Sequence, residues 1–171
     1  MPLRFASTKY IIPSLHDYTV YYGYKNLMAL APIHHNTRVS IHLKLESGAI
    51  TYESKKYIDN DIINLVINKY STLQLSHTSD LSGTMITSSE PIIIVSGSQC
   101  NFAVPKGIRL GDCNPFIESV LPTDQLDDMF ITPYISTRLN NTVRIQAVNS
   151  TDLTILIGKQ NIKNTKRKRF L

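Results

Sequence analysis

The stretch "TRVSIHLKL", residues 37–45, decides the fold class. Four apolar residues alternate strictly with four polar or charged ones: Val39, Ile41, Leu43 and Leu45 against Arg38, Ser40, His42 and Lys44. A period of two places alternate side chains on opposite faces of a strand, whereas a helix repeats every 3.6 residues. The stretch therefore predicts a β-strand with one buried and one solvent-facing side.

Further strand signals occur along most of the chain. Alternation recurs in "STLQLS" (71–76), "TVRIQA" (142–147) and "DLTILI" (152–157), and "PIIIVSG" (91–97) is a β-branched run typical of a strand covered on both faces. Turn signals separate these strands: "ESGA" (46–49), "TSDLSG" (78–83), "SGSQ" (96–99), "RLGD" (109–112) and "LNN" (139–141). "NDIINLVINKY" (60–70) competes as a helix, but its Ile, Val and Asn content disfavours one. We predict an all-β protein of antiparallel β-sandwich-like repeats, with a propeller-like β array as the alternative.

The alternation also predicts which residues form the core. The inward positions are Val39, Ile41, Leu43, Ile92, Ile94, Val143, Ile145, Leu153 and Ile155. A weak internal repeat accompanies them, because "YIIP" (10–13) is answered by "FITP" (130–133), and residues 29–41 align without gaps on residues 143–155. We therefore predict one β-rich domain over 1–158, holding one repeat unit and the start of a second near residue 130.

Positive charge is concentrated at the end of the chain. The net charge is +5, and six of the 18 Lys and Arg residues lie within residues 159–171 without an acidic residue among them. Residues 1–158 consequently carry a net charge of −1, from 12 basic and 13 acidic residues. A nearly neutral body has no broad basic face for phosphate backbones, so nucleic acid is not an expected partner of the body. We predict a basic, disordered tail at 159–171, and a polyanion would have to bind there.

No catalytic or metal-binding pattern emerges. The serines of "VSGSQ" lack the spacing of a nucleophile elbow, and His34 and His35 are adjacent, so that a strand would point them to opposite faces. "TDQLDD" (123–128) lacks the spacing and the glycine of a calcium loop. We expect no enzyme activity, no cofactor, no metal and no small-molecule substrate. The chain also has no apolar run long enough for a membrane span and no secretion signal at its start, so either the protein stays inside the cell or its true beginning is missing.

The two cysteines of the chain, Cys100 and Cys113, bracket the loop "NFAVPKGIRLGD". Spacing alone leaves a disulfide and two reduced thiols equally open, while a zinc site is disfavoured because no CxxC motif or nearby histidine accompanies the thiols.

A longer pattern surrounds the first cysteine. It reads "DLxGTxIxSxxPVxVxSGxxC", and this chain fills it with Asp80, Leu81, Gly83, Thr84, Ile86, Ser88, Pro91, Ser96, Gly97 and Cys100. Cys113 is then followed by Glu118, Leu121 and Pro122. In these features, over about residues 9–157, the chain resembles the conserved amino-terminal domain of the IgG Fc-binding protein family, large secreted proteins of mucus. It departs from the family in "NPF" (114–116), where Asp-His-Leu is usual, and in "LDDM" (126–129), where a Trp-Gly pair is usual.

The resemblance implies a disulfide between Cys100 and Cys113, an oxidising extracellular compartment, and a non-catalytic binding or adhesion module. It also implies that the chain is an interior or carboxy-terminal piece of a longer domain. The expected partner is an extracellular protein or glycoprotein, mucin-like or immunoglobulin Fc. Sequons at Asn140 and Asn149 agree with that compartment. The alternative function is an intracellular β-rich structural protein whose basic tail binds a polyanion.

A loop clasped by a disulfide is held in order before a partner arrives, so residues 101–121 are the predicted recognition surface. The residues that offer charges or apolar anchors there are Phe102, Lys106, Arg109, Asp112, Phe116 and Glu118. The competing interpretation is that the loop caps one end of the sheet and that Phe116 belongs to the core.

Overall fold

The computed structural model describes residues 3–15, 23–101, 113–132, 145–149, 152, 154–157 and 160–162. The strands are β1 (Ser7–Ile11), β2 (Asn26–Pro32), β3 (Thr37–His42), β4 (Ile50–Tyr52), β5 (Lys55–Tyr57), β6 (Ile62–Ile67), β7 (Leu73–His77), β8 (Met85–Asn101), β9 (Asn114–Ser119), β10 (Ile155–Ile157) and β11 (Gln160–Ile162). Two short 3₁₀ turns, η1 (Leu3–Phe5) and η3 (Thr123–Gln125), are the helical elements within these ranges. None of the described helical segments has the length and apolar character that crossing a membrane requires.

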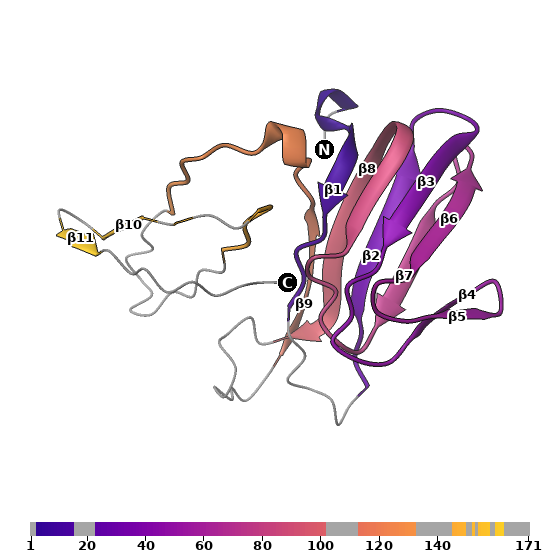
Figure 1. Ribbon diagram of the computed structural model, residues 1–171, viewed down its shortest axis with the longest axis horizontal. Coiled ribbons are helices and arrows are strands. Elements are labelled where there is room, and N and C mark those ends of the chain that lie inside the picture. The colour runs from indigo at the N-terminus through magenta and orange to yellow at the C-terminus, as the bar shows by residue number, and fades with distance from the viewer. Residues whose placement is uncertain are drawn as a thin grey trace.

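Seven strands form a large antiparallel sheet around β8 (Figure 1). The order is β6-β3-β8-β2-β7, and β1 and β9 also pair with β8. The 17-residue β8 serves several partners because different parts of it are used: β3 pairs with residues 85–88 and β2 with residues 92–98. The sheet curves until it is nearly barrel-shaped. The predicted all-β, antiparallel class is confirmed, including a strand rather than a helix at residues 62–67.

The core lies on the inner side of this curved sheet. Of the predicted core residues, Val39, Ile41 and Leu43 are at most 2% exposed, and Ile92 and Ile94 are fully buried. They pack in one cluster with residues from both ends of the sheet order, including Ile63 on β6 and Leu75 on β7. Alternation thus identified these inward faces correctly.

One core prediction is wrong. Ile145 is 46% exposed, and residues 145–147 are not in a strand, so the alternation of "TVRIQA" has no sheet face to select there. Val143, Leu153 and the side chain of Ile155 lie outside the described residues. Residues 130–132 and 145–149 of the supposed second repeat are likewise outside strands, and the β10–β11 hairpin spans the boundary placed at residue 158. The repeat and the domain boundary stay predictions.

The turn predicted at "SGSQ" is also wrong, because residues 96–99 are part of β8. Gly97 lies directly opposite Ile117 of β9. A Cβ atom at position 97 would come within 2.8 Å of Ile117 Cγ1 and would clash with the carbonyl oxygen of Phe116. Glycine is therefore present here to admit a neighbouring strand, not to turn the chain. The turns predicted at residues 46–49 and 78–83 do lie between strands, whereas those at 109–112 and 139–141 lie outside the described residues.

Candidate functional site

The end of β8 and the segment that follows the second cysteine form one continuous edge, residues 95–101 and 113–125, which we term the clasped edge. Cys100 and Cys113 are joined by a disulfide, and their Cα atoms are 5.2 Å apart. Such a bond closes the intervening loop at its neck and reduces the entropy of the unfolded chain. The loop thereby enters and leaves the sheet at one fixed point.

Within the clasped edge, β9 pairs with the end of β8. Val95 pairs with Ser119 and Ser98 with Phe116, and the register shifts between Ser98 and Asn101. This irregularity adjoins the disulfide, and bulges of this kind commonly bend a strand and redirect its side chains. β9 is consequently placed at the margin of the sheet, beside the beginning and end of the closed loop (Figure 1).

Hydrogen bonds fix the far end of the clasped edge to the sheet. The amide of Val120 donates to the carbonyl oxygen of Ile94 at 2.9 Å. Farther on, the hydroxyl of Ser7 donates to the carboxylate of Asp124 at 2.8 and 2.9 Å. The clasped edge is thus held covalently at one end and by a charge-assisted contact to β1 at the other.

Tyr10 lies next to the Ser7–Asp124 contact and connects β1 to β8 there. Its hydroxyl donates to the carbonyl oxygen of Ile92 at 2.7 Å and accepts from the amide of Ser7 at 2.9 Å. Burial raises the pKa of Tyr10, and the nearby charge of Asp124 raises it further, against the lowering effect of the Ser7 hydrogen bond. Tyr10 therefore stays a neutral donor that aligns β1 with β8.

Exposed apolar side chains gather on the clasped edge and just beyond it. Ile117 is 69% and Leu121 53% exposed, and the next segment presents Met129, Phe130 and Ile131 at 74%, 69% and 87%. Large apolar side chains that stay in water on a fixed backbone are typical of protein-binding surfaces. Ile117 and Leu121 lie within the predicted surface, residues 101–121, but the sequence did not single them out, and the residues beyond Leu121 were missed. Alternation indicates which face a side chain takes but not whether that face is covered.

The predicted binding residues are only in part within the described structure. Phe116 is half-buried and Glu118 is exposed, and both lie on the same side of β9, two positions apart. Phe102, Lys106, Arg109 and Asp112 lie outside the described residues, as does the sequon residue Asn140. The second sequon residue, Asn149, is exposed.

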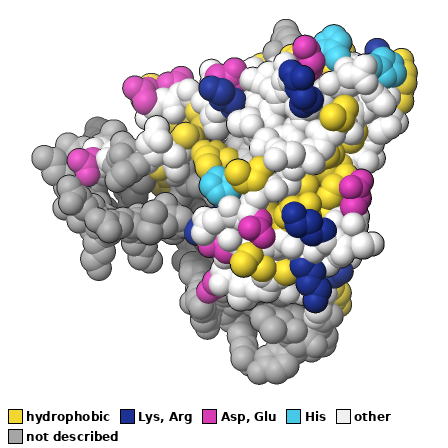
Figure 2. All heavy atoms as spheres, turned by 45° about the vertical axis from the view of Figure 1, so that its right-hand side comes forward, with side chains coloured by type: hydrophobic (Ala, Val, Ile, Leu, Met, Phe, Trp, Pro, Cys, Tyr) yellow, Lys and Arg dark blue, Asp and Glu magenta, His cyan; other side chains and the backbone are white. Residues whose placement is uncertain are grey.

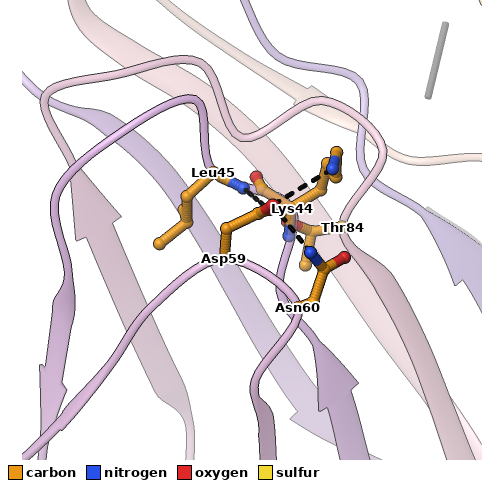
Figure 3. Close-up of polar contacts among 5 residues, drawn as sticks. All are labelled: Lys44, Leu45, Asp59, Asn60 and Thr84. Atoms are coloured by element: carbon orange, nitrogen blue, oxygen red, sulfur yellow. Dashed lines mark hydrogen bonds and ion pairs between the residues drawn. The ribbon is translucent and has the colours of Figure 1, made fainter.

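Asp59 is the centre of a polar cluster away from the clasped edge (Figure 3). Asp59 accepts hydrogen bonds from the Leu45 amide at 2.8 Å, from Lys44 Nζ at 3.2 Å and from Asn60 Nδ2 at 2.8 Å. The hydrogen bond from the Leu45 amide, which has the largest effect, and the contact with Lys44 lower the pKa of Asp59. The carboxylate already has its donors, so the cluster joins the segment after β3 to the segment before β6 and leaves no open catalytic position.

The outer face of the sheet carries a shallow hollow of about 440 Å³, lined by residues 38–40 of β3, 64–66 of β6 and 87–89 of β8. On the face drawn in Figure 2, hydrophobic side chains gather in the middle, with charged side chains around them. The lining offers one guanidinium, several hydroxyls and apolar side chains but no carboxylate–imidazole pair. In the ranges that the structure describes, no three His, Cys, Asp or Glu side chains are grouped closely enough to hold a metal ion.

Comparison with known proteins agrees with the residue pattern around the cysteines. The family model described as IgGFc binding protein matches residues 1–169. A curated relative, the IgGFc-binding protein of Homo sapiens, is 29% identical over 100 residues, which are 58% of this chain and 2% of that protein. No solved structure matches the chain significantly. The match extends over nearly the whole chain, and the chain therefore belongs to the IgGFc-binding protein family.

Proposed function

We propose that this chain is a non-catalytic, extracellular binding module that holds a protein or glycoprotein partner on the clasped edge. Membership of a family of binding proteins carries the proposal. The disulfide supports an oxidising compartment, because reduced cytosolic conditions disfavour such bonds. The exposed Ile117 and Leu121 supply apolar anchors on a fixed backbone.

The partner class follows from the relative. The human protein is named for binding the Fc part of IgG, and this chain spans 2% of its length. We propose immunoglobulin Fc or a mucin-like glycoprotein as the partner of this chain. Fixing the binding edge beforehand reduces the ordering free energy that the partner would otherwise have to supply.

The two N-glycosylation sequons also support an extracellular protein. Asn149 is exposed and heads an Asn-Ser-Thr sequon, and Asn140 heads an Asn-Asn-Thr sequon. Attachment at either residue would be consistent with passage through the secretory pathway. Mass spectrometry of non-reduced protein from its native source tests both aspects, since it should show peptides linked through Cys100 and Cys113 and glycan masses at these asparagines. Two free thiols would instead favour the intracellular alternative, whose basic tail lies mostly outside the described residues.

The binding test uses the full chain and two immobilised probes, IgG Fc and purified mucin. Wild type should bind at least one of them, and Ile117→Asp should weaken that binding about tenfold or more, because it places a charge in an apolar contact. Ile58→Asp is the matched control, since Ile58 is 58% exposed but lies between β5 and β6.

Two further variants test the closed loop. Arg109→Glu reverses a charge within it, and Cys100→Ser/Cys113→Ser opens it. Both should weaken binding while circular dichroism retains the β signature. Equal affinity of wild type, Ile117→Asp and both loop variants would rule out the clasped edge as the binding surface.

A further inference from the structure

The outer edge of β6 is unpaired within the described structure. β6 is the last strand of the sheet order and pairs with β3 on its inner side (Figure 1). No described strand or loop forms a backbone hydrogen bond with its outer side. An open edge of this kind presents a row of amide and carbonyl groups to any further strand.

The direction of the β6 backbone groups can be derived from its pairing. The amide of Leu43 donates to the carbonyl oxygen of Asp61 at 2.9 Å, and these two residues are opposite one another in the extended register of β3 and β6. Alternate residues in an antiparallel pair turn their backbone groups toward the partner. Ile63, Leu65 and Ile67 therefore bond to β3, while Ile62, Asn64 and Val66 direct their amides and carbonyls to the open edge.

The side chains of β6 do not protect its open edge against pairing with a further strand. "IINLVI" contains no charge and no proline, the features that usually discourage the addition of a strand. Ile62 and Val66 are 50% and 62% exposed, and Asn64 is exposed between them. The residues with free backbone groups are thus the same ones whose side chains leave apolar surface in water.

We propose that β6 pairs with β6 of a second copy of this chain, antiparallel about a two-fold axis at Asn64. In this register Asn64 lies opposite its own copy, and Ile62 lies opposite Val66 of the second copy. These are the residues whose backbone groups point outward, so each can both donate and accept a bond across the axis. Exposed Ile and Val side chains then cover one another, which is a favourable cross-strand pair.

The charges at the two ends of β6 also favour a second copy of the chain as the partner and an antiparallel direction of pairing. Asp61 precedes β6 and Lys69 follows it, and the strand between them is uncharged. An antiparallel second copy brings the acidic start of one strand beside the basic end of the other, whereas a parallel copy brings like charges together. The strand is complementary to itself at its centre, flanks and ends.

Sedimentation of the full chain over a range of concentrations tests the pairing. Wild type should convert from monomer to dimer as the concentration rises to about 100 µM, since an interface of one strand pair is small. Asn64→Lys and Asn64→Asp each place like charges directly opposite at the axis, so each should raise the dimer dissociation constant about tenfold or more. An equimolar mixture of the two variants sets unlike charges across the axis and should restore a dimer.

Thr87→Asp is the matched control for Asn64→Asp, because Thr87 lies opposite Lys9 of β1 and an acidic residue there meets an unlike charge. Thr87 is exposed and lies in the same row across the sheet, since Ser40 pairs with both Asn64 and Thr87, but it is on the central strand β8. This variant should dimerise as wild type does. A wild type that stays monomeric, an Asn64→Lys variant that dimerises normally, or a mixture that stays monomeric would each overturn the proposal.

Discussion

The hydroxyl of Ser7 donates to both carboxylate oxygens of Asp124, at 2.9 and 2.8 Å, and so joins two residues 117 positions apart in the chain. Ser7 is 7% exposed, whereas Asp124 is at the surface. The contact ties the end of the clasped edge to β1.

We expect Ser7→Ala to lower the free energy of unfolding by about 1–2 kcal/mol, the range of a hydrogen bond to a partly solvated charged group. Urea denaturation measures the change. Ser47→Ala is the control, since Ser47 is exposed with a long 3.4 Å contact to Ser79, and it should change the free energy of unfolding by less than about 0.5 kcal/mol. Equal effects of the two variants would show that the Ser7 contact does not stabilise the fold.

Ile94→Asp should abolish cooperative folding. Ile94 is fully buried in the core, and an unpaired carboxylate there has no compensating donor. Thermal melting followed by circular dichroism provides the measurement. Ile117→Asp carries the same change at a residue 69% exposed and should remain folded. A soluble Ile94→Asp variant with a sharp melting transition would contradict the assignment of the core.

Gly97→Val should loosen β9. Its side chain would collide with Ile117 and with the backbone of Phe116, so we expect a loss of about 1–3 kcal/mol in the free energy of unfolding. Hydrogen exchange should show faster exchange of the β9 amides. Thr87→Val, on an exposed position of the same strand, should leave β9 protected. Unchanged protection in Gly97→Val would mean that the two strands are farther apart than described.

Local alternation was sufficient to predict the all-β class, the strands that begin at residue 37 and contain residues 91–95, and five residues of the core. The strand signals of residues 37–45 and 91–95 are local in the sequence. Once a strand is assumed in each stretch, the burial of Val39, Ile41, Leu43, Ile92 and Ile94 follows. The turn predicted at "SGSQ" was wrong because glycine is usually a turn signal, whereas Gly97 is needed to admit β9, a strand that begins 17 residues later in the chain. The prediction that Ile145 is buried was wrong because alternation selects a buried face only where a sheet exists.

Less of the candidate site than of the fold could be predicted from the sequence. The cysteine pairing needed the family resemblance, since spacing alone left two outcomes open. The Ser7–Asp124 contact has no local signal, because nothing near either residue indicates the other. Exposure of Ile117 and Leu121 depends on their place at the margin of the sheet, which is a property of the topology rather than of the strand.

Acid should destabilise the fold through His77. His77 is 8% exposed, and its Nδ1 accepts a hydrogen bond from the Ser79 amide at 2.9 Å. Burial lowers the pKa of His77, and the positive charge of Lys25 lowers it further. The unfolded chain therefore takes up this proton at a higher pH than the folded one, so the stabilising contribution is present above about pH 6.5 and is lost as the pH falls toward the folded pKa.

Urea denaturation between about pH 7.5 and pH 5 measures this loss. His77→Gln should flatten the dependence on pH, and Lys25→Gln should reduce it by a smaller amount, because burial is the larger cause. The same slope in His77→Gln as in wild type would assign the dependence to other groups.

Removing residues 163–171 should abolish salt-sensitive retention on heparin. The deletion takes away five basic residues, which leaves 13 basic against 13 acidic residues in the rest of the chain. It retains both strands of the β10–β11 hairpin. The melting temperature should change little, and retention should fall to that of a neutral protein at low salt. Persistent salt-sensitive retention would reveal a basic surface on the body.

The central place of β8 has a consequence for synthesis of the chain on the ribosome. β1, β2 and β3 all pair with β8, yet β8 begins only at Met85. β3 and β6, and β2 and β7, can pair as the first half emerges, but the two pairs have no common strand to join them until residues 85–101 have been translated. Nascent chains halted before β8 should consequently remain open to chaperones and proteases, and release of β8 should convert them to the closed fold in a single late step.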